Sequence, residues 1–155
     1  MDDKGLTNQE LEKLTKSILG EKFLGVYPCD STPRIIDKQI FSVIFNMSKH
    51  NENGSHFISI LKKNQTVFYF DSRGKKCDNV YILNFLKHIS NKYSFNNFQM
   101  QNDSSIFCGV YCLGFLVACQ KLNFQPKTYI DLFLFNDTLN DQIVTEFIVS
   151  HLSSK

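Results

Sequence analysis

The sequence predicts a single α+β domain over residues 1–155. A length of 155 residues is typical of one compact domain, and no repeat, low-complexity block or linker divides the chain. Segments with helical periodicity lie near both ends, and β-prone runs rich in Phe, Val and Ile lie between them. With 43% hydrophobic and 14% aromatic residues, the chain can form an ordered core, which contains no Trp.

The first predicted helix covers residues 8–19. Thr7 and Glu10 have the spacing of a capping box, in which the two side chains satisfy backbone N–H groups at a helix start. Leucine and isoleucine side chains then recur at helical spacing until Gly20, a residue typical of a helix end.

The rest of the chain alternates strands and helices. The further predicted elements are strands over 23–27 and 39–47, a hairpin with strands over 57–61 and 66–70, and helices over 79–89, 108–122 and 141–152. Asp78 is the predicted cap of the helix over 79–89. The helix that begins at Cys108 is apolar on nearly every face, which indicates that the core encloses it. The last helix is expected to pack on the outside.

Charge, hydropathy and cysteine content exclude several classes of protein. With 17 basic and 15 acidic residues, the net charge of +2 is not the strongly basic footprint of a DNA-reading protein. The longest apolar run, residues 110–119, is much shorter than the roughly 20 residues that a membrane-spanning helix needs. The first residues do not form a secretory signal, and five cysteines without a C-x-x-C pair fit reduced thiols. We expect a soluble protein that is not secreted.

A predicted hairpin places a histidine beside an acidic residue. If the polar loop 62–65 is centred on the turn, residues whose numbers sum to 127 face each other, and His56 faces Asp71. At that distance the Asp71 carboxylate can accept a hydrogen bond from the imidazole and fix its tautomer. Taken separately, His56 fits the end of a polar loop and Asp71 fits the first position of a turn.

A cysteine at a helix start is the candidate nucleophile. Turn-forming residues 102–105 precede Cys108, so its sulfur is expected at a helix N-terminus, where free N–H groups and the helix dipole favour the thiolate. His56, oriented by Asp71, completes the activation of the thiol. Gln101, seven residues earlier, can donate to a developing oxyanion together with a backbone N–H near Cys108. The alternative is a loop glutamine and a small core cysteine.

The other cysteines and histidines have simpler interpretations. Cys112 and Cys119 lie inside the predicted helix and are assigned to packing. A zinc site through Cys108 and Cys112 is not favoured, because no second ligand pair has suitable spacing, and no metal is predicted. Cys29 and Cys77 are interpreted as incidental loop thiols that are exposed or half-buried. The other histidines are interpreted as exposed side chains: His50, His88 and His151.

The order histidine, acid, glutamine, cysteine resembles the adenovirus-type maturation proteases, the adenain family, which share a clan with the SUMO-specific proteases. The motifs that carry this resemblance are Gly54-Ser55-His56-Phe57, Tyr69-Phe70-Asp71-Ser72-Arg73-Gly74 and the segment from Gln101 to Cys112, with Phe23-Leu24-Gly25-Val26-Tyr27 as a further similarity. The resemblance extends from Leu6 to Leu152, and the cysteine follows the histidine, in contrast to papain-like enzymes.

The resemblance implies a fold and a set of roles. The cysteine helix is implied to be central and to pack on a mixed β-sheet that carries the histidine and the acid. Cys108 is implied to be the nucleophile, His56 the general base and then acid, and Asp71 the orienting acid. Gln101 is implied to be the oxyanion donor, with backbone support from Gly109.

Departures from the family pattern affect the implied partners. Phe57 replaces a Trp, and Ser72-Arg73 replaces Pro-Phe. No cofactor is required, but the resemblance implies activation by DNA and by a viral peptide linked through a cysteine. No cysteine lies between Cys77 and Cys108, which argues against that covalent link. Lys62-Lys63 and Lys75-Lys76 are the candidate small basic patch for a weak DNA contact.

The leading hypothesis is a viral maturation cysteine endopeptidase. It would cleave capsid or core precursor proteins by thioester acyl transfer during virion assembly, as a monomer, in the virion and the host nucleus or a cytoplasmic virus factory. One alternative is a deSUMOylating or deubiquitinating protease of the same clan. A second alternative is a non-enzymatic binding module on a protease fold.

Overall fold

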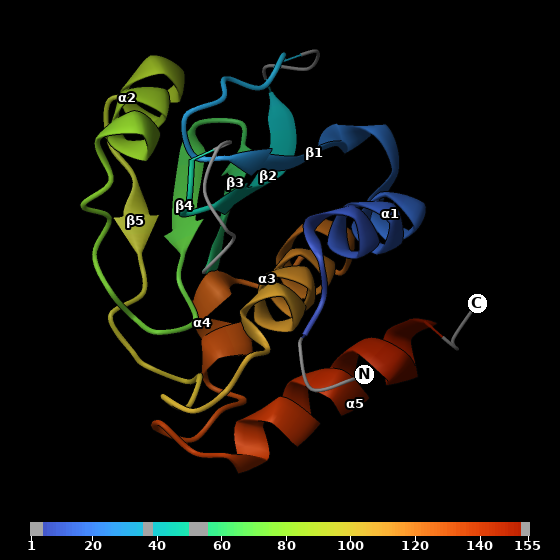
Figure 1. Ribbon diagram of the computed structural model, residues 1–155. Helices are drawn as coiled ribbons and strands as arrows, with labels where there is room; N and C mark the ends of the chain where they lie inside the picture. The colour runs from blue at the N-terminus through green and yellow to red at the C-terminus, as the bar shows by residue number, and fades with distance from the viewer. Residues whose placement is uncertain (1–4, 36–38, 50–55, 153–155) are drawn as a thin grey trace.

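A computed structural model describes residues 5–35, 39–49 and 56–152, and the described residues form the predicted α+β fold (Figure 1). A five-stranded mixed sheet has the order β1-β2-β3-β4-β5. Its two outer pairs, β1 with β2 and β4 with β5, are parallel, and the two inner pairs are antiparallel. The strands are β1 (Phe23–Pro28), β2 (Ile40–Asn46), β3 (Phe57–Lys63), β4 (Thr66–Phe70) and β5 (Ser94–Phe95).

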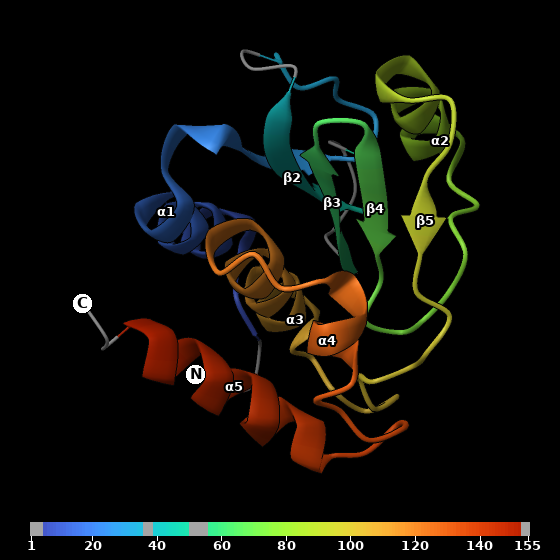
Figure 2. The same ribbon diagram turned by 180° about the vertical axis from the view of Figure 1, so that it is seen from behind.

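Helices cover both faces of this sheet. They are α1 (Asn8–Leu19) with the short 3-10 turn η1 (Gly20–Lys22), α2 (Val80–Ile89), α3 (Cys108–Leu116) with the π-helical turn η2 (Val117–Lys121), α4 (Pro126–Ile130) and α5 (Leu139–Leu152). Both views show α2 on one side of the sheet, and α1, α3, α4 and α5 on the other (Figures 1 and 2). In accord with the prediction for the last helix, α5 lies outside α3.

The three central strands, β2, β3 and β4, are largely buried on both faces, and their alternating side chains contribute to two cores. In β3, Phe57 and Leu61 point toward α3, whereas Ile58 and Ile60 point toward α2. The same alternation holds in β2 and β4, because successive side chains of a strand lie on opposite faces. This pattern explains why the predicted strands read as nearly continuous apolar runs.

Helix α3 is the centre of the larger core, as its all-apolar sequence predicted. Every residue from Cys108 to Leu116 is buried. The Phe115 ring stacks on that of Phe70 at 4.6 Å between centroids and 7° between planes, and it also stacks on Phe68 at 5.4 Å. These contacts fix the position of α3 along β4.

The capping box of the first helix is confirmed. Thr7 accepts from the Glu10 N–H at 3.1 Å, and the Glu10 carboxylate accepts from the Thr7 N–H at 3.0 Å. The cap of α2 differs from the prediction, because Asn79 rather than Asp78 accepts from the first free N–H groups. The predicted helix over 108–122 changes to a π-helical turn at Val117, and neither α4 nor β5 was predicted.

The hairpin register differs by two residues from the prediction. Ser59 pairs with Phe70 and Lys63 with Thr66, so the numbers of opposite residues sum to 129 rather than 127. The reason is Asn64, whose φ of 56° closes a two-residue turn and leaves Lys62 and Lys63 in β3. A shift of two residues keeps every side chain on its predicted face.

The outer edge of β1 is interrupted at Gly25. Pairing with β2 shifts register between Phe23 and Val26, and Gly25 has a φ of 139°. The Val26 N–H donates to Glu12 Oε1 of α1 at 2.8 Å, and a Cβ at Gly25 would lie 2.5 Å from that oxygen. Helix α1 therefore supplies an acceptor to the edge strand through a gap that only glycine leaves open.

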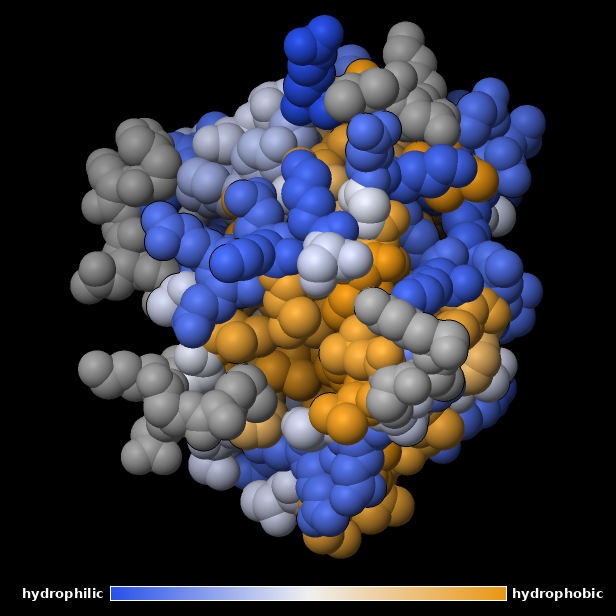
Figure 3. Space-filling model, turned by 90° about the vertical axis from the view of Figure 1, so that its right-hand side faces the viewer, coloured by the Kyte–Doolittle hydropathy of each residue, from blue (hydrophilic) through white to orange (hydrophobic). Residues whose placement is uncertain are grey.

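The surface beside α1 and the end of α5 is divided into polar and apolar parts. Figure 3 shows polar side chains in the upper half of this face and an apolar area below its centre. Partly buried side chains of both helices, such as Leu14 and Phe147, pack against the core.

Among residues 5–35, 39–49 and 56–152, no helix is long and apolar enough to cross a bilayer.

Two glycines of α3 differ in how closely they are packed, which predicts different costs for the same substitution. A Cβ at Gly114 would lie 2.6 Å from the Tyr129 hydroxyl and 2.8 Å from Val144. A Cβ at Gly109 would lie 3.1 Å from Leu11 and 3.3 Å from Phe57, both flexible side-chain atoms. Alanine gains about 0.5–1 kcal/mol over glycine inside a helix, whereas overpacking costs roughly 1–3 kcal/mol.

We therefore expect Gly114→Ala to lower the free energy of unfolding by about 1–2 kcal/mol, and Gly109→Ala to change it by less than about 1 kcal/mol. Urea denaturation of the two variants and the unchanged protein measures both values. Equal losses at the two positions would contradict the packing described for Gly114.

Candidate active site

Three of the four predicted site residues come together where the sheet meets α3. Cys108 is the first residue of α3, His56 directly precedes β3, and Asp71 directly follows β4. The His56 carbonyl accepts from the Met47 N–H at 2.7 Å, which continues the pairing of β3 with β2 up to the histidine. Gly54 and Ser55, the first residues of the histidine motif, lie outside the described residues.

The predicted pair of His56 and Asp71 is present. His56 Nε2 lies 2.8 Å from Asp71 Oδ1, and the two side chains are 13% and 6% exposed. The pair is diagonal rather than directly opposite, because the observed register moves Asp71 by two positions relative to His56. The turn interpretation of Asp71 also holds: Oδ1 accepts from the Arg73 N–H, and the Asp71 carbonyl accepts from the Gly74 N–H.

Asn96 fixes the backbone of Asp71, a role that the sequence did not predict. This buried amide accepts from the Asp71 N–H at 3.0 Å and donates to the Asp71 carbonyl at 2.6 Å. Asn96 directly follows β5, which pairs with β4. Its side-chain amide thus provides the two hydrogen bonds that a neighbouring strand would otherwise make to the backbone of Asp71. An isolated asparagine in an unpredicted segment carries no sequence signal for this position.

The other nitrogen of the His56 ring faces the sulfur. Because Nε2 is bonded to Asp71, Nδ1 is left for the thiol, and it makes no hydrogen bond with any described residue. Cys108 lies close enough to interact electrostatically with the ring. The arrangement fixes which nitrogen exchanges a proton with sulfur and which holds the acid.

The two groups shift each other's pKa in opposite directions. Burial lowers the pKa of His56, but the hydrogen bond to Asp71 and the neighbouring Cys108 raise it more, to about 9 from an ordinary 6.5. Burial raises the pKa of the Cys108 thiol, but the interaction with His56 lowers it below its usual value. The geometry therefore favours the form of the pair in which a thiolate lies beside an imidazolium.

Backbone groups add to the stabilisation of the thiolate. The Phe57 N–H interacts with the Cys108 sulfur and lowers its pKa, as does the positive charge of Arg73. Phe107, the residue before the helix, provides no side-chain cap. The first N–H groups of α3 therefore remain available to an anion near Cys108, as predicted from its position at a helix start.

Gln101 lies in a buried polar chain beside the cysteine loop. Its Oε1 accepts from the Ser72 hydroxyl at 2.6 Å, and its Nε2 donates to the Ser105 carbonyl at 3.0 Å. The Ser105 hydroxyl in turn donates to Asp141 at 2.9 Å and accepts from the Phe107 N–H. The chain fixes the loop that leads into α3, and donation from Gln101 to an oxyanion stays a prediction.

Gly109 has a packing role in this structure. Its missing Cβ allows α3 to approach Phe57 and Leu11 closely, and Phe57 is the residue after the catalytic histidine candidate. The close approach brings the start of α3 against the start of β3. Backbone support of an oxyanion by Gly109 also stays a prediction.

The other four cysteines are buried. The assignment of Cys112 and Cys119 to packing is confirmed, because both are buried; burial raises the pKa of Cys119 to about 12 and that of Cys112 well above its usual value. Cys29 and Cys77 are buried, which corrects the interpretation as incidental loop thiols, exposed or half-buried.

The histidines outside the site differ from one another. His88 is exposed, as expected. His151 is half-buried instead, because its Nδ1 lies 2.7 Å from the Phe147 carbonyl and its ring packs on Phe147. His50 lies outside the described residues.

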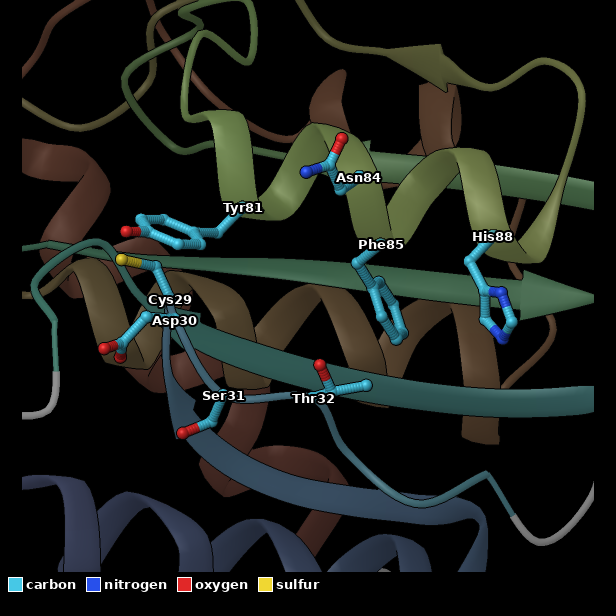
Figure 4. A pocket seen from close by; sticks show the side chains of 8 residues that line it. All are labelled: Cys29, Asp30, Ser31, Thr32, Tyr81, Asn84, Phe85 and His88. Carbon is cyan, nitrogen blue, oxygen red and sulfur yellow. The ribbon is translucent and has the colours of Figure 1, made fainter.

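A cavity of about 330 Å³ lies between α2 and the segment that follows β1 (Figure 4). It is lined by a second cysteine and a second histidine, Cys29 and His88. Figure 4 shows them at opposite ends of the cavity, with Phe85 between them. This cavity therefore does not contain a second cysteine–histidine pair.

The two lysine pairs do not form one basic patch. Lys62 and Lys63 lie at the turn end of β3, where their amines donate to the Ile89 carbonyl and to Asn123. Lys75 and Lys76 follow β4, at the opposite end of the hairpin. A seven-residue strand such as β3 separates the two ends by roughly 20 Å.

Between residues 5 and 152, gaps at 36–38 and 50–55 excepted, no group of three metal-ligating side chains occurs.

The fold resembles that of solved cysteine-protease structures. No family model and no curated protein sequence matches this chain. Two solved structures of the ASFV pS273R protease, one of them with selenomethionine, superpose with TM-scores of 0.64 and 0.62 at 15% sequence identity. They cover 94% of this chain, which spans about two thirds of their length (66% and 67%). At this identity the likeness establishes the fold, a SUMO-protease-like arrangement of helices on a mixed sheet.

We expect Cys108 to be the most reactive thiol of the protein, with a pH profile set by His56. Its alkylation by iodoacetamide should rise with pH below the usual range of a thiol, because its pKa is lowered, and should change again near pH 9, where His56 loses its proton. Peptide mass analysis after timed alkylation measures the rate at each cysteine.

Buried Cys112 and Cys119 serve as internal controls and should stay unlabelled in the folded protein. His56→Ala should slow Cys108 alkylation at pH 7 about tenfold or more. An ordinary thiol profile that His56→Ala leaves unchanged would contradict the ion pair.

Proposed function

We propose that the protein is a cysteine endopeptidase that cleaves peptide bonds through a thioester intermediate. The observation that carries the proposal is that three groups lie together: the Asp71 carboxylate is bonded to His56 Nε2, and the Cys108 sulfur interacts with the same imidazole ring. His56 and Cys108 shift each other's pKa in the directions that nucleophilic catalysis requires. The likeness to the fold of a viral protease supports the same conclusion.

The first half of the reaction forms the acyl-enzyme. The Cys108 thiolate attacks the scissile carbonyl carbon, a C–S bond forms, and the carbonyl oxygen becomes an oxyanion. The C–N bond then breaks as His56 Nδ1 gives its proton to the leaving amine. The thioester remains on Cys108, and the imidazole is neutral.

The second half restores the enzyme with water. Neutral His56 accepts a proton from water, whose oxygen attacks the thioester carbon, and the C–S bond breaks to release the carboxylic acid. The thiolate and the imidazolium are then regenerated. Asp71 holds the ring by Nε2 through both halves, and donors to the oxyanion are the free N–H groups at the start of α3 and the Gln101 amide.

Viral precursor proteins are the proposed substrates. The adenain-like order of the four residues and the fold likeness to the ASFV pS273R protease support capsid or core precursors over other polypeptides. Cleavage after a small residue such as Gly follows from the same resemblance, and the protein would act in the virion and the infected cell. DNA or a viral peptide as activator and a ubiquitin-like substrate are outcomes that the experiments below distinguish.

We expect the purified protein to cleave some member of a library of internally quenched peptides with Gly before the scissile bond. Cys108→Ala and His56→Ala should lower kcat/KM by about 10³-fold or more, because the nucleophile and its base are lost. Cys112→Ala is the matched control from the same helix and should retain activity.

Fusions of ubiquitin-like proteins, and the same library with added DNA, complete this test. Cleavage of the fusions but not of the peptides would favour the deSUMOylating or deubiquitinating alternative. No cleavage under any condition, together with an unreactive Cys108, would favour a binding module and contradict the proposal.

Ser72 offers a separate test of the oxyanion side. Its hydroxyl orients the Gln101 amide, so Ser72→Ala should lower kcat about tenfold with little change in KM. The alkylation rate of Cys108 should stay the same, because the thiolate depends on His56. Ser72→Thr keeps the hydroxyl and should restore most of the rate. A fall in kcat that Thr does not restore would point to a packing role for Ser72.

A further inference from the structure

A small cavity with basic walls opens beside the catalytic histidine. It measures about 230 Å³, and its lining includes His56, Asp71, Arg73, Lys75 and Lys76. Met47, Tyr69 and Asp78 complete the lining. The cavity is smaller than the roughly 300–1,000 Å³ of pockets for small-molecule ligands, and its size suits a single side chain.

The cations of this cavity lack partners in the described part of the chain. Arg73 Nε is buried and donates no hydrogen bond to any of these residues, although a buried donor is normally bonded. No ion pair to Arg73, Lys75 or Lys76 occurs among these residues. The Asp71 carboxylate already accepts from His56 and from the Arg73 backbone N–H. With Arg73, Lys75 and Lys76 against the carboxylates of Asp71 and Asp78, the lining has a net positive charge.

The position of the cavity relative to the reacting atoms defines which part of a substrate reaches it. Its lining includes His56 and Asp71 but neither Cys108 nor Gln101. The acyl half of a substrate lies at Cys108, whereas the leaving amine lies at His56, which gives it a proton. We therefore assign this cavity, which touches His56 but not Cys108, to the segment that follows the scissile bond.

We infer that this cavity is a subsite for an acidic side chain, Asp or Glu, on the leaving-group side of the scissile bond. The inference rests on the proposed function. Arg73 supplies the guanidinium, which is suited to bind a carboxylate through two N–H groups, and Lys75 and Lys76 supply surrounding positive charge. Arg73 also lies close enough to Cys108 to stabilise its thiolate electrostatically. The subsite would therefore attract an anion next to the nucleophile.

A pair of small reagents tests the subsite without any knowledge of the substrate. Iodoacetate carries a carboxylate and iodoacetamide does not, and both alkylate the same thiolate. The ratio of their rates at Cys108 cancels changes in the thiol itself. Arg73→Gln should lower this ratio about three- to tenfold, and added salt should lower it in the unchanged protein.

Two variants control this measurement. Arg73→Lys keeps the charge and should retain most of the ratio. Lys121→Gln removes a charge at the other end of the α3–η2 helix, roughly 20 Å from Cys108, and should leave the ratio unchanged. A ratio that does not respond to Arg73→Gln, or responds equally to Lys121→Gln, would overturn the inference.

Peptide pairs then locate the subsite. Substrates with Glu should be cleaved faster than those with Gln at one position after the scissile bond, by about three- to tenfold in kcat/KM, and Arg73→Gln should remove the preference. Equal cleavage, or a preference before the scissile bond, would overturn the assignment. A loss of short duplex DNA binding in Arg73→Gln without any effect on peptides would assign the cavity to nucleic acid instead. If no peptide is cleaved, the proposed function fails, and the reagent ratio still decides whether an anion subsite exists.

Discussion

The requirement to bury α3 on every side determines how the rest of the molecule is arranged. Its nine residues carry no polar face, so the sheet, α1 and α5 must each cover part of it. The stack of Phe115 on Phe70 and the close approach at Gly109 fix the helix along and against the hairpin. Because the nucleophile begins the helix, and the histidine and acid stand at strand ends, this packing also aligns the candidate catalytic groups.

At the site, burial favours the neutral forms of His56 and Cys108, whereas their mutual interaction favours the charged forms. The effect of the interaction on both pKa values is the larger one. Burial alone would make both the His56 ring and the Cys108 thiol neutral. Each becomes charged because the other is charged and because Asp71 and the Phe57 N–H support the pair. The two groups therefore titrate as a coupled pair.

Short-range rules allowed much of this structure to be predicted from the sequence. The capping box of α1 and the buried cysteine helix follow from spacing and composition, which act over a few residues. The hairpin register does not, because it depends on the left-handed conformation of Asn64, which the sequence permits but does not impose. The pair of His56 and Asp71 survived this error because a shift by two keeps both on one face. Asn96 and Ser72 lie far along the chain from the groups they orient, and only the folded chain brings them there.

The interruption of β1 at Gly25 has a consequence for how copies of the protein meet. An exposed sheet edge with a long row of free N–H and C=O groups is a template for strand addition and aggregation. Here one edge carries a register shift and has its Val26 N–H bonded to Glu12, and the opposite edge strand, β5, has two residues. Neither edge offers a foreign strand a long, regular row of partners. Pairing between copies of the protein through this sheet is therefore disfavoured at both of its edges.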